Sequence, residues 1–143
     1  MLRPRFFDLE EFLDSSVARQ KGVSNLPSWT VVEHLNELAM FMDKLREDWG
    51  SGIKITSGFR CPKLNDNYIP GASKTSVHKI GYACDCYPMN GKYKEFVAFI
   101  KEWAKDKQFD QIIEEASKGS KWVHIGLWSN RGEQRRMVFQ ITL

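Results

Sequence analysis

The clearest helical pattern in the chain lies between residues 26 and 50, where apolar residues recur every three or four positions. This spacing places them on one face of an amphipathic helix. The residues of that face are Val31, Leu35, Leu38, Met42 and Leu45. Ser28 or Thr30 can cap the first turn, and Gly50 is suited to end the helix.

Two other stretches show the same helical spacing. The stretch 7–22 has acidic residues in its first turn and ends at Gly22, and the stretch 92–106 is also rich in aromatic residues. The apolar faces of the two stretches consist of Phe7, Leu9, Phe12 and Leu13, and of Phe96, Phe99, Ile100 and Trp103. We therefore expect three helices in the chain.

Strand-like patterns occupy most of the remaining sequence. The predicted strands are IKITSGFR (53–60), YACDCYPM (82–89), DQIIEE (110–115), KWVHIGLW (121–128) and RMVFQITL (136–143). The segment 61–76 is rich in proline, asparagine and glycine and is predicted to be a long polar loop, of the kind that often lines a binding site. The charged segment NRGEQRR (130–136) is predicted to be a solvated hairpin turn.

These elements predict an α+β fold with a mainly antiparallel sheet packed against helices. A chain of 143 residues fits one domain, covering residues 1–143. We expect a helical part at about 6–49, followed at about 50–143 by an α+β part that carries the candidate chemistry.

Composition excludes several classes of function. The net charge is only +3 and the basic residues are scattered, so we expect no nucleic-acid partner. No apolar run is long enough for a signal peptide or a membrane span, so we expect synthesis in the cytoplasm and no membrane insertion. Three cysteines form an odd number, which argues against a disulfide framework and suits reduced thiols.

The segment TSVHKIGYACDCYP (75–88) concentrates the residues that can bind a metal. On a strand, Asp85 lies on the face opposite Cys84 and Cys86, so the two sets cannot reach the same ion. One possibility is a closed structural site made by the two cysteines with histidines, and the other is an open site made by Asp85 with His78 and His124. We favour the open site because closed cysteine sites usually use a wider spacing. His34, within the long helix, is expected to be structural.

The motif S-x-H-x-x-G-x-A-x-D in SVHKIGYACD, followed by W-x-H in WVHIGL, resembles the zinc DD-peptidases of peptidoglycan metabolism. ITSGFRCPKLN upstream and FDQIIEE downstream keep the same order as in that family. The family comprises D-Ala-D-Ala carboxypeptidases and L-Ala-D-Glu endopeptidases with the Hedgehog/DD-peptidase fold. The resemblance runs from about residue 6 to 138 and is greatest to the small single-domain branch of phages and prophages.

The resemblance implies a role for individual residues. His78, Asp85 and His124 match the ligands of one zinc ion. Arg60 matches the arginine that contacts a substrate carbonyl or carboxylate oxygen, and Ser76 matches a serine near the metal. The family's small residues at the positions of Gly81 and Ala83 let the histidine and the aspartate approach each other.

The chain departs from the family in one respect. Many members carry a catalytic glutamate or histidine a few residues before the last zinc histidine, whereas here residues 119–122 read GSKW. In the phage-like branch the strand FDQIIEE supplies the glutamate, so the resemblance favours Glu115 over Glu114 as the general base. Strand parity alone leaves both open.

We therefore expect a zinc peptidase that acts on peptidoglycan stem peptides as a monomer. The cell wall is its expected site of action, reached after release by lysis machinery or as a phage component. The alternative is a zinc-containing cell-wall or peptide binding module without catalysis, which the displaced glutamate suggests.

Overall fold

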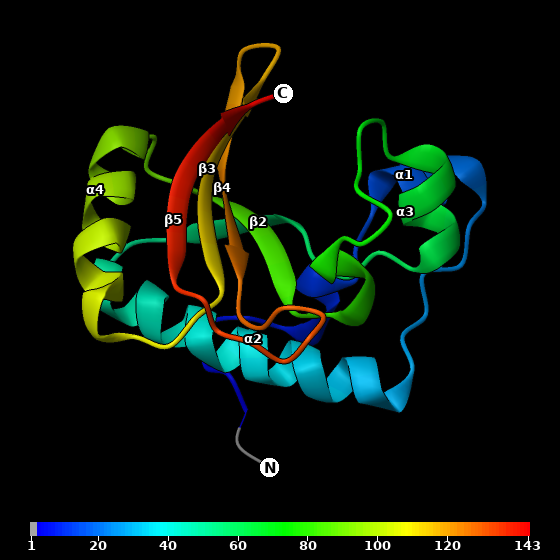
Figure 1. Ribbon diagram of the computed structural model, residues 1–143, viewed down its shortest axis with the longest axis horizontal. Helices are drawn as coiled ribbons and strands as arrows, with labels where there is room; N and C mark the ends of the chain where they lie inside the picture. The colour runs from blue at the N-terminus through cyan, green and yellow to red at the C-terminus, as the bar shows by residue number, and fades with distance from the viewer. Residues whose placement is uncertain (1–2) are drawn as a thin grey trace.

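A computed structural model describes residues 3–143. The helices are η1 (Leu9–Phe12), α1 (Ser16–Lys21), α2 (Trp29–Trp49), α3 (Pro62–Tyr68), η2 (Val77–Ile80), α4 (Tyr93–Trp103) and η3 (Ala104–Asp106), where η marks a 3-10 helix. The strands are β1 (Ile53–Ser57), β2 (Ala83–Pro88), β3 (Gln111–Ser117), β4 (Ser120–Gly126) and β5 (Met137–Thr142). The predicted α+β fold is confirmed (Figure 1).

The five strands form one sheet in the order β1-β2-β4-β3-β5. Neighbouring strands are antiparallel except β3 and β5, which are parallel. The chain therefore leaves β4, passes the end of β3 and enters β5 on the far side of β3. The predicted hairpin at 130–136 is wrong, because β5 pairs with β3 and not with β4.

The long helix α2 forms as the sequence predicts. The Ser28 side chain accepts a hydrogen bond from the Val31 backbone N–H, and Gly50 ends the helix in the left-handed conformation. Leu35, Leu38 and Met42 of α2 are buried in one core with Cys84, Cys86 and Val123 of the sheet. Helix α4 contributes Phe96 and Ile100 to the same core.

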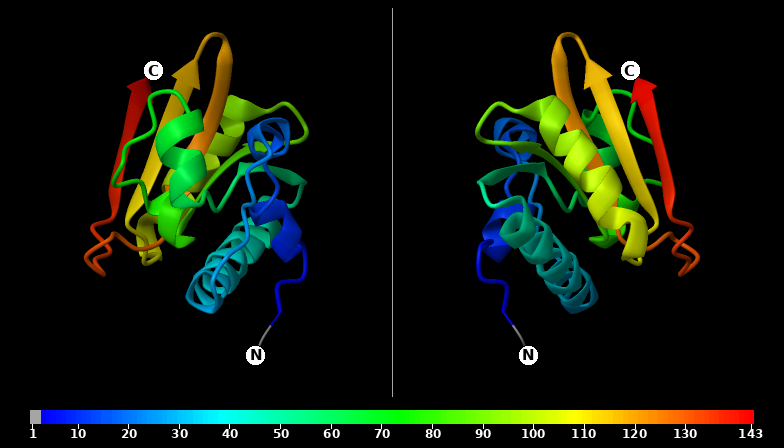
Figure 2. Two further views of the ribbon diagram at one scale, coloured as in Figure 1. Left: turned by 90° about the vertical axis from the view of Figure 1, so that its right-hand side faces the viewer. Right: turned by 90° about the vertical axis from the view of Figure 1, so that its left-hand side faces the viewer.

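Helices α3 and α4 lie on opposite sides of the sheet (Figures 1 and 2). One face of the central strands is thus sealed by α2 and α4. The other face looks toward α3 and the loop that follows it. No helix within residues 3–143 is long and apolar enough to cross a membrane.

The single helix expected at 7–22 is instead two short ones, η1 and α1. Ser15 adopts an extended conformation and its side chain caps α1 by accepting from the Ala18 N–H at 3.1 Å. The Phe12 carbonyl, which a continuous helix would use, accepts from the Phe59 N–H at 2.6 Å. Gly58 permits this close approach, because a Cβ there would lie 2.3 Å from the Phe12 oxygen.

The long loop expected at 61–76 is also partly helical, since its first half forms α3. Pro62 occupies the first turn, where its missing N–H costs nothing, and Leu64 anchors the helix in the interior. The buried side chain of Asn65 donates to the Ser73 carbonyl at 2.9 Å and folds residues 69–76 back over the sheet.

Candidate metal centre

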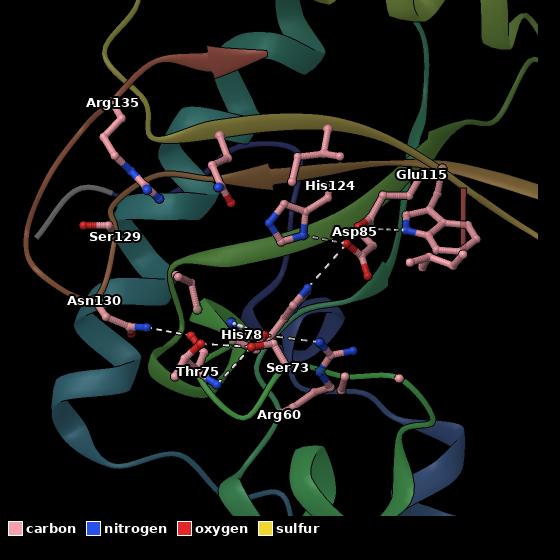
Figure 3. Close-up of a pocket in the computed structure, with 18 of the residues that line it drawn as sticks. Arg60, Ser73, Thr75, His78, Asp85, Glu115, His124, Ser129, Asn130 and Arg135 are labelled. Atoms are coloured by element: carbon pink, nitrogen blue, oxygen red, sulfur yellow. Dashed lines mark hydrogen bonds and ion pairs between the residues drawn. The ribbon is translucent and has the colours of Figure 1, made fainter. Parts of the chain in front are cut away.

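Three of the predicted site residues meet on the face of the sheet that α2 and α4 leave open. His78 comes from η2, Asp85 from β2 and His124 from β4. Each offers a ligand atom, and these atoms lie within 4.8 Å of one another (Figure 3). Asp85 and His124 are directly paired across the two strands, so the sheet register sets their distance. Within residues 3–143 this is the one such group of three.

The His78 ring is held from behind by the backbone. Its Nδ1 lies 2.7 Å from the Gly58 carbonyl oxygen, which can only accept, so Nδ1 carries the hydrogen. Nε2 is then free of hydrogen and faces Asp85 Oδ1 at 3.4 Å. A backbone carbonyl that fixes the tautomer of a ligand histidine is a recurring feature of metal sites. His78 is 2% exposed.

The His124 ring approaches the same carboxylate oxygen. Its Nδ1 lies 3.1 Å from Asp85 Oδ1, and its ring packs edge-on to His78 with centroids 5.2 Å apart. One nitrogen of each ring is thus directed at one oxygen of Asp85. The prediction from strand alternation is also met, since Val123 and Ile125 are buried in the core on the opposite face.

The electrostatics prepare Asp85 and His78 for metal binding, whereas His124 holds its proton more strongly than an ordinary histidine and must release it when a metal binds. Burial raises the pKa of Asp85, but the neighbouring His78 and His124 rings outweigh this effect and hold the pKa well below its ordinary value. Burial lowers the pKa of His78, so that ring is neutral near pH 7. For His124 the burial effect is outweighed by Asp85 and Glu115, which raise its pKa. A cation would take over the role of the His124 proton beside Asp85.

The alternative cysteine site is ruled out by the fold. Cys84 and Cys86 point away from the histidines into the hydrophobic core, and both are fully buried. Burial raises the pKa of both thiols, so neither is a thiolate at neutral pH. They behave as small apolar side chains.

Glu115 and Glu114 lie on opposite faces of β3. Glu114 forms an ion pair with Lys101 of α4 at 2.8 Å. Glu115 faces the same cavity as the His–Asp–His group, and its Oε1 accepts a hydrogen bond from Trp122 Nε1 at 2.7 Å (Figure 3). Burial raises the pKa of Glu115 above its ordinary value, a shift suited to a group that must take and release a proton.

Arg60 and Ser76 also face this cavity. Arg60 Nη2 donates to Ser76 Oγ at 3.4 Å, and Ser76 in turn caps η2 by accepting from the His78 backbone N–H at 3.2 Å. Arg60 Nε is buried and has no hydrogen-bond partner among the described residues, so a donor of this side chain stays unpaired. Burial lowers the Arg60 pKa, while Asp85 and Glu115 counteract the shift.

Comparison with known proteins agrees with this arrangement. A model of the family described as Peptidase M15 matches residues 5–126, which include all the residues named in the cavity so far. The chain belongs to the peptidase M15 family. Membership supports a zinc metallopeptidase that acts on peptidoglycan-type substrates. A search of curated proteins finds no match.

The donor set of this M15 chain fits zinc. Two imidazoles and one carboxylate are ligands that zinc accepts in catalytic sites, and such sites keep a further position for water or substrate. The Gly58 carbonyl, which is bonded to His78 Nδ1, orients the His78 ring so that its other nitrogen faces the ion. His78, Asp85 and His124 are therefore the residues that would hold the ion.

A small residue is needed at Gly81 because of its contact with α2, and not because of the approach of His78 to Asp85 that the family resemblance implies. It ends η2 in the left-handed conformation, with φ of 84°, and packs against α2. A Cβ there would lie 3.0 Å from the Val31 side chain and 3.1 Å from the Val31 carbonyl. The residue thus seats η2 on α2, which positions His78 indirectly.

The cavity of this M15 domain measures about 680 Å³ and has a wall that the sequence interpretation missed. That wall is the segment between β4 and β5, residues 127–136, called here the crossover loop. Ser129, Asn130 and Arg135 of the crossover loop line the cavity (Figure 3). A run of charged residues gave no signal for this role, because the wall exists only through the pairing of β5 with β3.

Proposed function

We propose that the chain is a zinc-dependent peptidase that hydrolyses an amide bond in peptidoglycan stem peptides. The observation that carries the proposal is the meeting of the His78–Asp85–His124 group with Glu115 in one cavity of an M15 chain. When bound, zinc supplies Lewis-acid polarisation of a carbonyl group and lowers the pKa of a water molecule to about 7.

Glu115 is the proposed general base. Its carboxylate takes a proton from the attacking water and passes it to the leaving amine. The Trp122 hydrogen bond occupies Oε1 and fixes the orientation of the group, which leaves Oε2 for the proton. Because β3 is rigidly paired to β4, the base stays in a fixed relation to His124.

Arg60 is the proposed substrate-binding cation, and Ser76 supports it. A partly buried guanidinium that is already in position stabilises the oxygen that becomes negative as the amide carbon turns tetrahedral. The same planar fork also suits a free carboxylate of the substrate. The first use suits an endopeptidase and the second a carboxypeptidase, so cleavage at D-Ala-D-Ala or at L-Ala-D-Glu stays a prediction.

The alternative, a zinc-containing wall-binding module without catalysis, was suggested by the absence of a glutamate just before His124. Glu115 supplies a carboxylate in the cavity from the neighbouring strand, which favours the enzyme. We propose that the enzyme works at the bacterial cell wall, and a monomer is the expected form.

The test combines metal analysis with digestion of purified peptidoglycan by the wild type, His78→Ala and Glu115→Gln. We expect about one zinc per chain and new amino termini from the wild type. His78→Ala is expected to lose the metal, and Glu115→Gln to keep the metal and lose the activity. Glu114→Gln is the matched control, since that side chain faces α4. A zinc-loaded wild type that cleaves no peptidoglycan would favour the binding module.

A further inference from the structure

The crossover loop is held rigidly against the rest of the cavity. The Leu127 backbone N–H donates to the Tyr82 carbonyl at 2.8 Å, and the Asn130 side chain donates to the Thr75 carbonyl at 2.6 Å. Within the loop, the Gln134 side chain donates to the Leu127 carbonyl at 3.1 Å. Arg135 reaches the buried Asp110, just before β3, through two parallel bonds of 2.8 and 2.9 Å. The loop is thus fixed at both ends and in the middle.

The Asp110–Arg135 pair is asymmetric in its burial. Asp110 is 1% exposed, whereas the Arg135 side chain is 44% exposed and lines the cavity. Arg135 donates to Asp110 through Nε and Nη2, and its Nη1 has no hydrogen-bond partner among residues 3–143. A guanidinium fixed on one edge therefore presents unused N–H donors on the other, at little entropic cost to a ligand.

Ser129 offers a second unused donor in the same loop. Its Oγ accepts from the backbone N–H groups of Arg131 and Glu133, at 3.2 and 3.0 Å. The hydroxyl hydrogen is not needed for either bond and can reach an acceptor in the cavity. Ser129 and Arg135 lie on one side of the His–Asp–His group, and Arg60 and Glu115 lie elsewhere around it (Figure 3).

Net charge alone does not decide what binds here. Arg131 and Glu133 also line this end of the cavity and have opposite charges. The preference for one kind of ligand group comes instead from Arg135 and Ser129, which offer only hydrogen-bond donors to the cavity. Such a set matches a group with two acceptor oxygens and no hydrogen, which in a peptide is a carboxylate.

We propose that Arg135 and Ser129 form a second substrate subsite, distinct from Arg60, which binds a carboxylate of the peptide. This inference rests on the proposed function and narrows it to substrates that carry a free carboxylate on the crossover-loop side of the scissile bond. Asp110 is a positioning residue, because it acts only through Arg135. The carboxylate is either the C-terminal one or one on a side chain.

The test measures binding and turnover separately, with three forms of one synthetic stem peptide. One form has free carboxylates, one is amidated at the C-terminus and one is amidated at the side-chain carboxylate. Calorimetry on zinc-loaded Glu115→Gln gives the dissociation constants without turnover, and kcat/KM comes from the wild type. We expect one of the two amidations to weaken binding about tenfold, the loss of a charge-assisted hydrogen bond, with a rise in KM.

The variant that removes the guanidinium is the double substitution Asp110→Asn and Arg135→Gln. It is introduced into the wild type for turnover and into Glu115→Gln for binding. Arg135→Gln alone would leave the buried charge of Asp110 without a partner, and the double variant removes that charge as well. We expect it to bind free and amidated peptides within about twofold of each other. Arg136→Gln is the matched control, because Arg136 donates to backbone carbonyls of residues 105 and 107 outside the cavity.

Arg135→Lys covers the case in which the double variant does not fold. It keeps a cation beside Asp110 but lacks the planar fork, so the discrimination is expected to fall while the unfolding temperature stays close to that of the wild type. Equal binding of all three peptides by the parent protein would overturn the subsite, and so would unchanged discrimination in the Arg135 variants. Discrimination in binding without any turnover would support the subsite and count against the peptidase.

Discussion

The two faces of the central strands share one backbone and differ in almost everything else. On β2 and β4, Cys84, Val123 and Ile125 point to the side covered by α2 and α4 and are fully or almost fully buried in apolar contacts. Asp85 and His124 alternate with them and point to the cavity. Strand alternation thus separates residues that hold the fold from residues that carry the chemistry, although the two kinds are adjacent in the sequence.

The polar and charged groups on the cavity face lower the stability of the fold, and the apolar burial on the core face offsets that loss. Asp85 is a largely buried carboxylate, and its charge is compensated by two histidines and, in the proposed enzyme, by a cation. Changes on one face should therefore affect metal binding and turnover, and changes on the other should affect unfolding.

The largest expected effect is that of Asp85→Asn. An amide carries no charge to balance the cation, so we expect zinc affinity to fall more than about 100-fold, beyond the effect typical of outer-shell changes. Activity should disappear with the metal, as measured by metal analysis and peptidoglycan digestion. Full zinc occupancy in this variant would contradict the assigned ligand set.

The neighbouring residues Ile112 and Ile113 test the two faces directly. Ile112 packs into the core with α2 and α4, and Ile113 lines the cavity; both are nearly fully buried. Ile112→Ala should lower the free energy of unfolding by about 2–5 kcal/mol and leave kcat/KM of the folded protein unchanged.

Ile113→Ala should also destabilise the protein. Unlike Ile112→Ala, it should change kcat/KM as well, because the smaller side chain enlarges the cavity. Denaturant unfolding and steady-state kinetics of both variants provide the check. Equal effects of the two variants on kcat/KM would show that the faces are not independent.

Trp122→Phe is expected to shift the pH dependence of kcat/KM. The Trp122 hydrogen bond lowers the pKa of Glu115 against the opposing effect of burial. Its loss raises that pKa, and because the base must be ionised, the acidic limb of the profile should move to higher pH by about one unit.

Trp128→Phe is the matched control for this shift. The Trp128 indole donates to Glu37 at 2.7 Å, and Trp128 does not line the cavity. An acidic limb that moves equally in both variants, or in neither, would argue against Glu115 as the titrating base.

The smallest expected effect is that of Glu114→Gln on stability. Its ion pair with Lys101 is partly exposed, so its loss should cost less than about 1 kcal/mol in the free energy of unfolding. Turnover should stay at the wild-type level. A large loss of turnover would reverse the choice between Glu114 and Glu115.

Local patterns in the sequence determined much of this protein. The 3.6-residue period and the caps at Ser28 and Gly50 define α2, because a long amphipathic helix is specified by its own residues. Alternation put Asp85 and His124 on the face opposite the cysteines, since a strand has a period of two. The motif spacing supplied His78, and the resemblance supplied the preference for Glu115.

Only the tertiary structure decided the rest. The break at residues 13–15 follows from the Phe12–Phe59 hydrogen bond, a contact between distant segments that no local pattern records. The parallel pairing of β5 with β3 turned a predicted hairpin into the crossover loop and brought Ser129 and Arg135 to the cavity. Strand order is a choice among long-range pairings of similar local propensity, so packing of the whole domain decides it.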